Sequence, residues 1–163
     1  MVTPTRNYTI FLSKVLGAST RGMLQVPIVF AGVMLFGVQL PDIIGIAAFI
    51  VSLFLLGLGL SSIYLFLTMK SSDWQIPTVV ANFINLPLMF SSTALFPNEN
   101  FPTWMQVISN LNPVSFSSTF GREIILSGNI ANANWLYFFY LLIFASSTLL
   151  IGVLVANKTL KID

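Results

Sequence analysis

The chain has 163 residues and contains neither cysteine nor histidine. Their absence excludes disulfides, thiol nucleophiles, imidazole general bases and the usual zinc ligands. Charge is also scarce, because 7% of the residues are charged, against about 25% in ordinary soluble domains. A soluble fold of this length could not cover its surface with so few charges, so the composition indicates a membrane protein.

Two further absences narrow the function. The sequence has no Gly-x-x-x-x-Gly-Lys-Ser/Thr loop, which argues against nucleotide binding by this chain. The apolar stretches expected to span the membrane carry no charge, whereas ion-coupled carriers and intramembrane enzymes usually place titratable groups there. A net charge of +2 is too small to indicate a nucleic-acid partner. We therefore expect no catalytic, metal-binding or cofactor-binding residue.

What is present is a series of long apolar stretches. About 18 or more apolar residues suffice to cross the hydrocarbon core, and four stretches qualify. We therefore expect an all-α membrane protein with one transmembrane domain over residues 1–163. Its predicted spans are residues 22–40, 43–69, 75–95 and 135–156.

A short helix should precede the first span. Thr3 and Pro4 suit its start, and the apolar residues that follow, from Tyr8 to Leu16, fall at helical spacing. This pattern fits a helix lying at the membrane interface. It fits equally well a polar lead-in to the first span, and the sequence leaves the two alternatives open.

The positive charges predict the orientation. Lysine and arginine gather on the cytoplasmic side of membrane proteins, and with both termini inside, six of the seven basic residues lie there. Only Arg122 falls outside. We therefore expect a multi-pass protein of the cytoplasmic membrane with both termini cytoplasmic. The six predicted inner residues are Arg6, Lys14, Arg21, Lys70, Lys158 and Lys161.

Small residues recur along the second predicted span. Gly45, Ala48, Ser52 and Gly59 follow one another at spacings of three, four and seven. Small residues on one stripe let helices approach closely in lipid. They indicate a packing seam, either within the chain or between subunits, although glycine is also generally enriched in membrane helices.

The third predicted span and the segment after it break the apolar pattern. Asn82 and Asn85 share one face, which should point at another helix or at a water-filled cavity. Pro87 should kink that helix. The following residues, 96–134, are divided by prolines and include an amphipathic piece around Trp104, so we expect an outer re-entrant segment before the last span.

Residues 82–122 resemble the C-terminal signature of type 2 ABC exporter permeases, the daunorubicin-resistance-like transmembrane subunits. The resemblance implies a permease that pairs with a second permease subunit and docks on ABC ATP-binding subunits. The residues that carry it are Asn82, Asn85, Leu86, Pro87, Phe90, Phe96, Pro97, Pro102, Thr103, Trp104, Leu111, Asn112, Pro113 and Arg122.

The resemblance also assigns roles to residues. It implies a pathway or dimer seam, an outer re-entrant cap over residues 97–126, and an ATPase docking surface near the N-terminus. The implied seam residues are Asn82, Asn85, Pro87, Phe90 and Phe96. The implied cap residues are Pro97, Pro102, Trp104, Asn112, Pro113 and Arg122. The implied docking residues are Arg6 and Lys14.

The chain departs from the family pattern in two ways. Ser92-Thr93-Ala94 stands where the family often has Ser-Gly before the aromatic-proline pair. The family has six spans, whereas four are visible here. We therefore expect a truncated or split permease, or one completed by a companion chain.

The resulting functional prediction is the permease subunit of an ATP-driven exporter. An apolar, aromatic pathway suits an amphipathic or lipid-like substrate, and ATP would be bound by a separate subunit. Membrane lipid is the remaining expected partner. The alternative is a polytopic membrane anchor or assembly protein without transport activity. An intramembrane enzyme would need catalytic groups that the sequence does not supply.

Overall fold

The computed structural model describes residues 7–37, 41–69, 71, 73 and 75–159. These residues form helices and no strand, so the predicted all-α fold class is confirmed for the described part of the chain. Two short 3-10 helices, η1 and η2, accompany the α-helices. In chain order the elements are α1 (Asn7–Met23), α2 (Val26–Leu35), α3 (Ile43–Thr68), α4 (Ile76–Phe90), η1 (Asn98–Asn100), α5 (Thr103–Ser109), α6 (Pro113–Ser127), η2 (Ile130–Asn132) and α7 (Trp135–Thr159).

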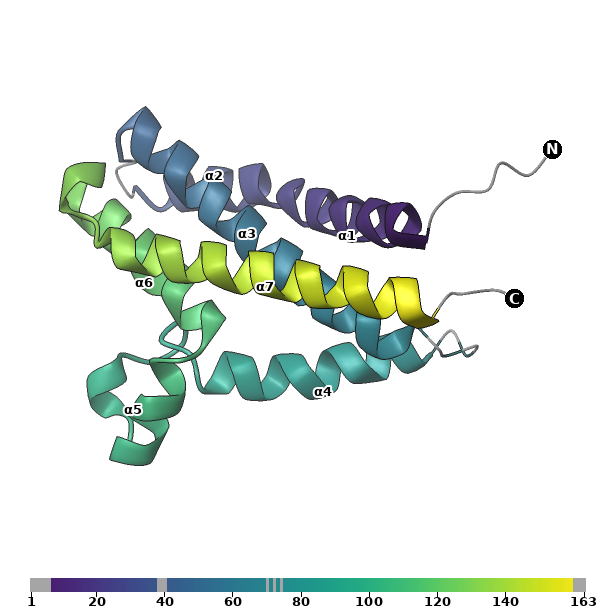
Figure 1. The fold of residues 1–163 in the computed structure, drawn as a ribbon. Coiled ribbons are helices and arrows are strands. Elements are labelled where there is room, and N and C mark those ends of the chain that lie inside the picture. Colours follow the sequence, from purple (N-terminus) through teal and green to yellow (C-terminus); the bar gives the residue numbers. More distant parts are fainter. Residues whose placement is uncertain (1–6, 38–40, 70, 72, 74, 160–163) are drawn as a thin grey trace.

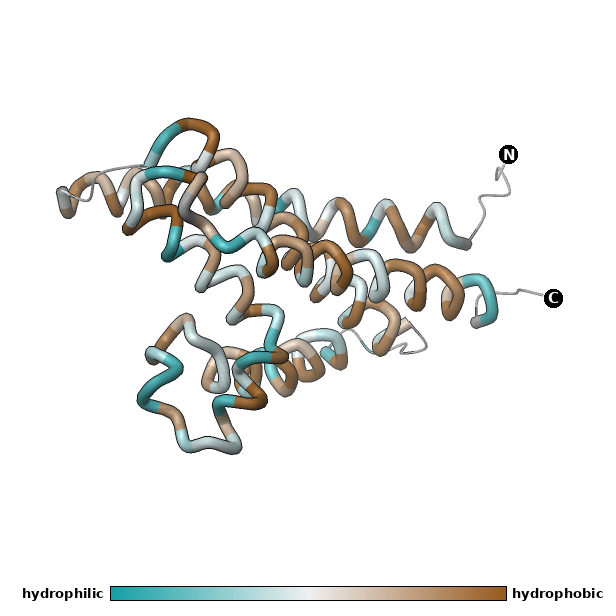
Figure 2. Tube along the Cα trace, turned by 60° about the vertical axis from the view of Figure 1, so that its left-hand side comes forward, coloured by the Kyte–Doolittle hydropathy of each residue, from teal (hydrophilic) through white to brown (hydrophobic). Residues whose placement is uncertain are grey.

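The long helices run side by side, with α3 packed against both α1 and α7 (Figure 1). α1 begins and α7 ends at one end of this bundle, which we call the terminal end. The cap segment, residues 97–126, lies at the opposite end, and α4 stands apart along one side. Hydrophobic residues dominate the helices, whereas hydrophilic ones concentrate in the cap segment and near the end of α7 (Figure 2).

Among the described residues, three helical stretches are long and apolar enough to cross a membrane. They are Tyr8–Leu35, Ile43–Thr68 and Trp135–Lys158. α4 has 15 residues, which at 1.5 Å per residue gives about 22 Å, less than the hydrocarbon core of about 30 Å. α4 is thus shorter than the predicted third span, residues 75–95, because the helix ends at Phe90.

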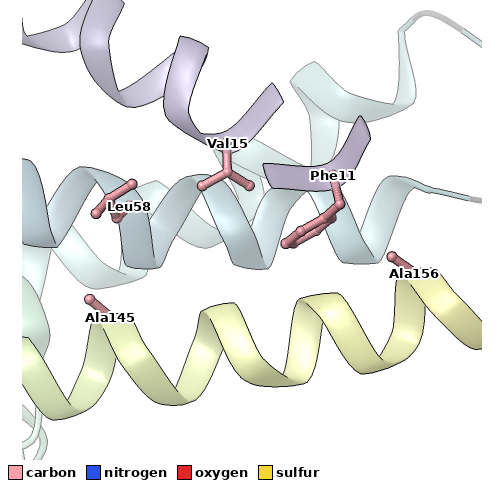
Figure 3. Close-up of a cluster of buried hydrophobic side chains, with 5 residues drawn as sticks. All are labelled: Phe11, Val15, Leu58, Ala145 and Ala156. Atoms are coloured by element: carbon pink, nitrogen blue, oxygen red, sulfur yellow. The ribbon is translucent and has the colours of Figure 1, made fainter. Parts of the chain in front are cut away.

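The predicted N-terminal helix is observed, but it packs within the bundle. Phe11 and Val15 are each only 1% exposed. They lie between α3 and α7, where they meet Leu58, Ala145 and Ala156 (Figure 3). α1 is therefore a bundle helix that leads into the first long apolar stretch, which favours the second of the two alternatives over a helix lying apart at the interface.

α1 and α2 together form the first long apolar stretch. α1 ends at Met23. Two backbone hydrogen bonds of 3.2 Å then form a turn: the Leu24 nitrogen donates to the Arg21 carbonyl, and the Gln25 nitrogen donates to the Gly22 carbonyl. Pro27 sits in the first turn of α2, where its missing N–H is tolerated. Arg21 thus lies inside the stretch Tyr8–Leu35, not at the boundary expected from the predicted span 22–40.

The small residues of α3 pack within the chain. Gly45, Ser52 and Gly59 are buried, and a Cβ added at Gly59 would lie 2.3 Å from Cε1 of Phe144. On the facing helix, a Cβ at Gly152 would lie 2.2 Å from Cζ of Phe11. Glycine therefore lets aromatic rings lie directly on a neighbouring helix backbone, which confirms the intrachain alternative for the predicted seam.

A hydrogen bond joins the same two helices. The buried Ser62 hydroxyl donates to the carbonyl of Thr148 over 2.8 Å. Thr148 in turn donates from Oγ1 to the Phe144 carbonyl, 2.9 Å away and four residues earlier in α7. The Ser62 hydroxyl therefore serves the packing of α3 against α7.

Candidate functional site

α4 has no buried residue and packs chiefly against α3. Its one side-chain hydrogen bond to α3 is donated by the Tyr64 hydroxyl to Oδ1 of Asn85. Asn85 therefore faces another helix, as the sequence predicts. Asn82 is exposed and makes no hydrogen bond to the described residues, so the two asparagines, although on one broad face, have different surroundings.

A cavity of about 530 Å³ lies between α1, α2, α3 and α4. Asn85 and Tyr64 form part of its wall, which is otherwise mostly apolar. It lies beside the hydrogen bond between Tyr64 and Asn85 that joins α3 to α4. The remaining lining residues are Ala18, Ser19, Gly22, Met23, Gln25, Val26, Leu53, Leu56, Gly57, Leu60 and Ser61.

The end of α4 is fastened to the cap segment by Asn112. The last carbonyls of a helix have no partner within it, and here Asn112 donates from Nδ2 to the carbonyl of Leu88 over 2.6 Å. The same nitrogen donates to the Ser91 hydroxyl over 3.0 Å, and Ser91 itself donates to the Pro87 carbonyl over 2.7 Å. Side-chain donors thus satisfy the backbone carbonyls at the end of α4 that have no partner within the helix.

Asn112 has a second role at the start of α6. Its Oδ1 accepts from the Val114 nitrogen over 2.9 Å, which is the N-cap arrangement. Pro113 follows in the first turn of α6 and is buried. Asn112 and Pro113 therefore form a helix start that also binds the preceding helix, α4.

Thr93 is the centre of a hydroxyl network between α4 and α6. Its nitrogen donates to the Ser115 hydroxyl over 3.1 Å, and its Oγ1 lies 2.9 Å from Ser118 Oγ and 3.0 Å from Thr119 Oγ1. Its carbonyl accepts from Nη2 of Arg122 over 2.8 Å. The residues that reach Thr93 from α6 are Ser115, Ser118, Thr119 and Arg122.

The first half of the cap segment is a compact loop. Pro97 precedes η1 and Pro102 precedes α5, each with an extended ψ that turns the chain. Phe96 lies edge-on to the buried Phe101, with ring centroids 6.4 Å apart. Trp104 is 65% exposed, so it contributes to the surface of the cap rather than to its interior.

α6 carries the chain back to the bundle. Phe120 and Ile124 are fully buried against residues of α3 and α7, and a Cβ at Gly121 would lie 2.1 Å from the Phe49 ring. Glu123 accepts from the Asn134 nitrogen over 2.7 Å just before α7 begins. The cap is therefore held both to α4 and to the core of the bundle.

A second cavity, the cap cavity, lies where the cap segment meets α7, and its volume is about 450 Å³. Its wall carries hydroxyl and amide groups, three aromatic rings and the side chains of Arg122 and Glu99. The full lining is Thr93, Pro97, Asn98, Glu99, Ser109, Asn110, Ser115, Phe116, Thr119, Arg122, Tyr137 and Tyr140.

The structure brings only some of the predicted site residues together. Asn112, Pro113 and Arg122 meet at the junction of the cap with α4, whereas Phe90 and Phe96 are half-exposed. Lys14 is exposed on α1, and Arg6 lies outside the described residues. No group of three or more acidic residues in the described ranges is placed to hold a metal ion.

Sequence reasoning missed Tyr64 and the role of Thr93. The signal for the second was available, because Ser115, Ser118, Thr119 and Arg122 follow one another at helical spacing on one face. A polar face of this kind indicates that α6 forms hydrogen bonds with another segment. Its partner, 22 residues or more away in sequence, could be found only from the fold.

The chain matches known transport proteins over much of its length. The family model described as "ABC-2 type transporter" matches residues 1–126. A putative transport permease, ycf38, of Cyanophora paradoxa is 32% identical over 110 residues, which cover 68% of this chain and 38% of the relative. The probable multidrug ABC transporter permease YbhR of Escherichia coli K12 is 24% identical over 148 residues, or 91% of this chain and 40% of the relative.

The chain thus spans about two fifths of the length of these curated relatives. No solved structure gives a significant match. The family model covers more than half of the chain, and the match includes α1 to α5 and most of α6, with the junction between α4 and the cap. The chain therefore belongs to the ABC-2 type transporter family.

Proposed function

We propose that the chain is the membrane-spanning part of a permease subunit in an ATP-driven exporter. Its membership of the ABC-2 type transporter family carries this proposal. The relative from Escherichia coli is named a multidrug ABC transporter permease, which supports efflux as the direction of transport. In this proposal the subunit works in the cytoplasmic membrane with both termini inside, and a separate subunit binds ATP.

The exposed face of α4 supports pairing with a second permease subunit. Phe83 is 79% exposed, and Val79, Leu86 and Phe90 are also exposed beside Asn82. A face that combines polar asparagine with large apolar side chains suits a contact with another helix better than a contact with lipid alone. The second permease subunit would cover this face, and Asn82, Pro87, Phe90 and Phe96 would lie along the seam.

The chemistry of this face supports an amphipathic or lipid-like substrate. Apolar and aromatic side chains predominate, and the polar side-chain groups within α4 are the hydroxyl of Thr78 and the amides of Asn82 and Asn85. An ion would need several oxygen ligands or charges along its path. An amphipathic molecule would instead use the apolar surface and a few hydrogen bonds.

The terminal end of the bundle supports docking of an ATP-binding subunit. Lys14 is exposed in the middle of α1, and the predicted docking residue Arg6 precedes that helix in the sequence. Cation-rich surfaces at this end would complement an acidic partner surface. Movement of that partner would be transmitted along α1 and α3.

The proposal is tested by identifying what the chain assembles with. The full-length protein is tagged at its own C-terminus, extracted with detergent from its native membrane and analysed by native mass spectrometry. We expect two permease subunits with two ATP-binding subunits. Recovery of the chain alone, or with membrane proteins that bind no ATP, would contradict the proposal and favour an anchor or assembly protein.

Transport is then measured with the recovered complex in sealed vesicles. ATP-dependent accumulation of a fluorescent amphipathic probe is compared for the native chain and for Asn82→Leu. Leu154→Ile serves as the control, because Leu154 is an exposed apolar residue of α7 and lies outside the proposed seam. We expect Asn82→Leu to lower transport while the control retains it.

A further inference from the structure

The cap cavity combines groups of opposite charge with aromatic rings. Arg122 supplies the positive charge and Glu99 the negative one, and both line the same space. Its volume of about 450 Å³ lies within the range of about 300–1,000 Å³ that is usual for sites of small organic ligands. The wall is therefore suited to a ligand that carries both signs of charge.

Arg122 is positioned to bind an anion. Its Nη2 donates to the Thr93 carbonyl over 2.8 Å, which anchors the guanidinium at the wall. A guanidinium has five N–H donors, so this contact leaves others for a ligand. Their forked arrangement matches the oxygens of a phosphate group.

Three aromatic rings of the wall are positioned to bind a cation. The ring centroids of Phe116 and Tyr140 lie 5.2 Å apart, and those of Phe116 and Tyr137 lie 6.3 Å apart. Clustered aromatic faces attract ammonium groups, including quaternary ones. Glu99 adds a carboxylate to the same cavity, which further favours a positively charged amine.

The surroundings of the cavity point to a lipid rather than a free phosphate ester. Along α7, Leu136 and Ile143 are 58% and 60% exposed and lie on the same side of the helix as Tyr140. This apolar stripe leads from the cavity along the bundle. A ligand with its head group in the cavity could lay its acyl chains there.

We propose that the cap cavity binds the zwitterionic head group of a membrane phospholipid. The phosphate lies against Arg122, the amine lies among the rings and Glu99, and the acyl chains follow the exposed stripe of α7. The site lies beside the first turns of α7, the region where a transmembrane helix meets the polar head groups. This inference does not depend on the proposed transport function.

The test is competitive lipid binding to the full chain, measured by native mass spectrometry in detergent. Phosphatidylethanolamine, phosphatidylcholine and phosphatidylglycerol with identical acyl chains are offered at equal concentration. We expect the two zwitterionic lipids to be retained in preference to phosphatidylglycerol. Equal retention of all three, or preference for phosphatidylglycerol, would overturn the proposal.

Two variants locate the site. Glu99→Gln should reduce the preference for zwitterionic over anionic lipid about two- to fivefold, the range for an exposed charge pair. Tyr140→Leu should weaken binding of the zwitterionic lipids about two- to fivefold. Matched controls are Asp73→Asn and Phe36→Leu, because both residues are exposed and neither lines the cavity. Equal effects of variants and controls would overturn the assignment.

Arg122→Gln tests the phosphate contact and should weaken the retention of all three lipids, because each of them carries a phosphate. Arg122 also donates a hydrogen bond to the Thr93 carbonyl, so circular dichroism must show that the variant is folded. If it is not, the binding of lipid to Glu99→Gln and Tyr140→Leu tests the site. Glycerophosphocholine, which has the head group without acyl chains, should compete weakly. Competition as strong as that of the lipid would overturn the assignment of a membrane phospholipid.

Discussion

Asn112 donates a hydrogen bond of 2.6 Å to the carbonyl of Leu88 and so joins the start of α6 to the end of α4. The same side chain caps α6 through the Val114 nitrogen. One residue thus ends one helix and begins another. Its amide nitrogen donates to α4, and its carbonyl oxygen accepts from the first turn of α6.

The two roles of Asn112 can be separated by substitution. Asn112→Asp keeps an oxygen for the cap but loses the donor to Leu88, which should lower the free energy of unfolding by about 1–3 kcal/mol. Asn112→Ala loses the cap as well, which should add about 1 kcal/mol. Unfolding in mixed micelles measures both. Equal stability of the native chain and Asn112→Asp would show that the Leu88 contact contributes nothing.

Gly59 should tolerate no side chain. Gly59→Ala places a methyl group against the Phe144 ring and should destabilise the protein by about 1–3 kcal/mol, as overpacking does. Gly17→Ala is the control, since nothing lies within 4 Å of its added Cβ, and it should be neutral or stabilising by up to about 1 kcal/mol. Adding Phe144→Leu to Gly59→Ala should restore part of the loss. Identical unfolding of the two alanine variants would refute the close contact.

Ser62 should contribute one interhelical hydrogen bond. Ser62→Ala removes its contact with the Thr148 carbonyl, and we expect a loss of about 0.6 kcal/mol, the average for such bonds within membranes. Ser147→Ala is matched, because the Ser147 hydroxyl bonds only to the Phe144 carbonyl of its own helix. The difference between the unfolding free energies of the two variants gives the contribution of the hydrogen bond between α3 and α7. That difference should be zero if Ser62 does not bond to Thr148.

Tyr64 should hold α4 close to α3. Tyr64→Phe removes the donor to Asn85 while keeping the ring. Spin labels at the exposed positions Leu67 and Val79 should then show a broader distance distribution in pulsed electron resonance. Tyr137→Phe is the control on another helix. An unchanged distribution in the Tyr64 variant would mean that other contacts fix α4.

Part of the fold follows from local sequence patterns. The uncharged runs predicted long apolar helices, and the spacing of Gly45, Ser52 and Gly59 predicted a packing seam. The prolines predicted that residues 96–134 are divided, and one such division is the start of α6 at Asn112 and Pro113, where capping and the fixed φ of proline act within a few residues. Such features depend on neighbours in the chain and can therefore be read from it.

Other features depend on partners distant in the sequence. Phe11 is buried because Gly152, far along the chain, leaves room for its ring, and the polar residues beside it suggested a helix at the interface. Thr93 meets four side chains of α6, which lie 22 residues or more away in the sequence. The roles implied for Asn82, Phe90 and Phe96 stay predictions, because they concern surfaces toward other subunits.

The fastening of α4 has a mechanical consequence. Its side-chain links to α3 and to the cap involve Asn85, Leu88 and Ser91, which lie in or just after the second half of the helix. The first half, beginning at Ile76 near the terminal end, has no such link among the described residues. We therefore expect α4 to move by turning about its second half, with the largest displacement at its first turn.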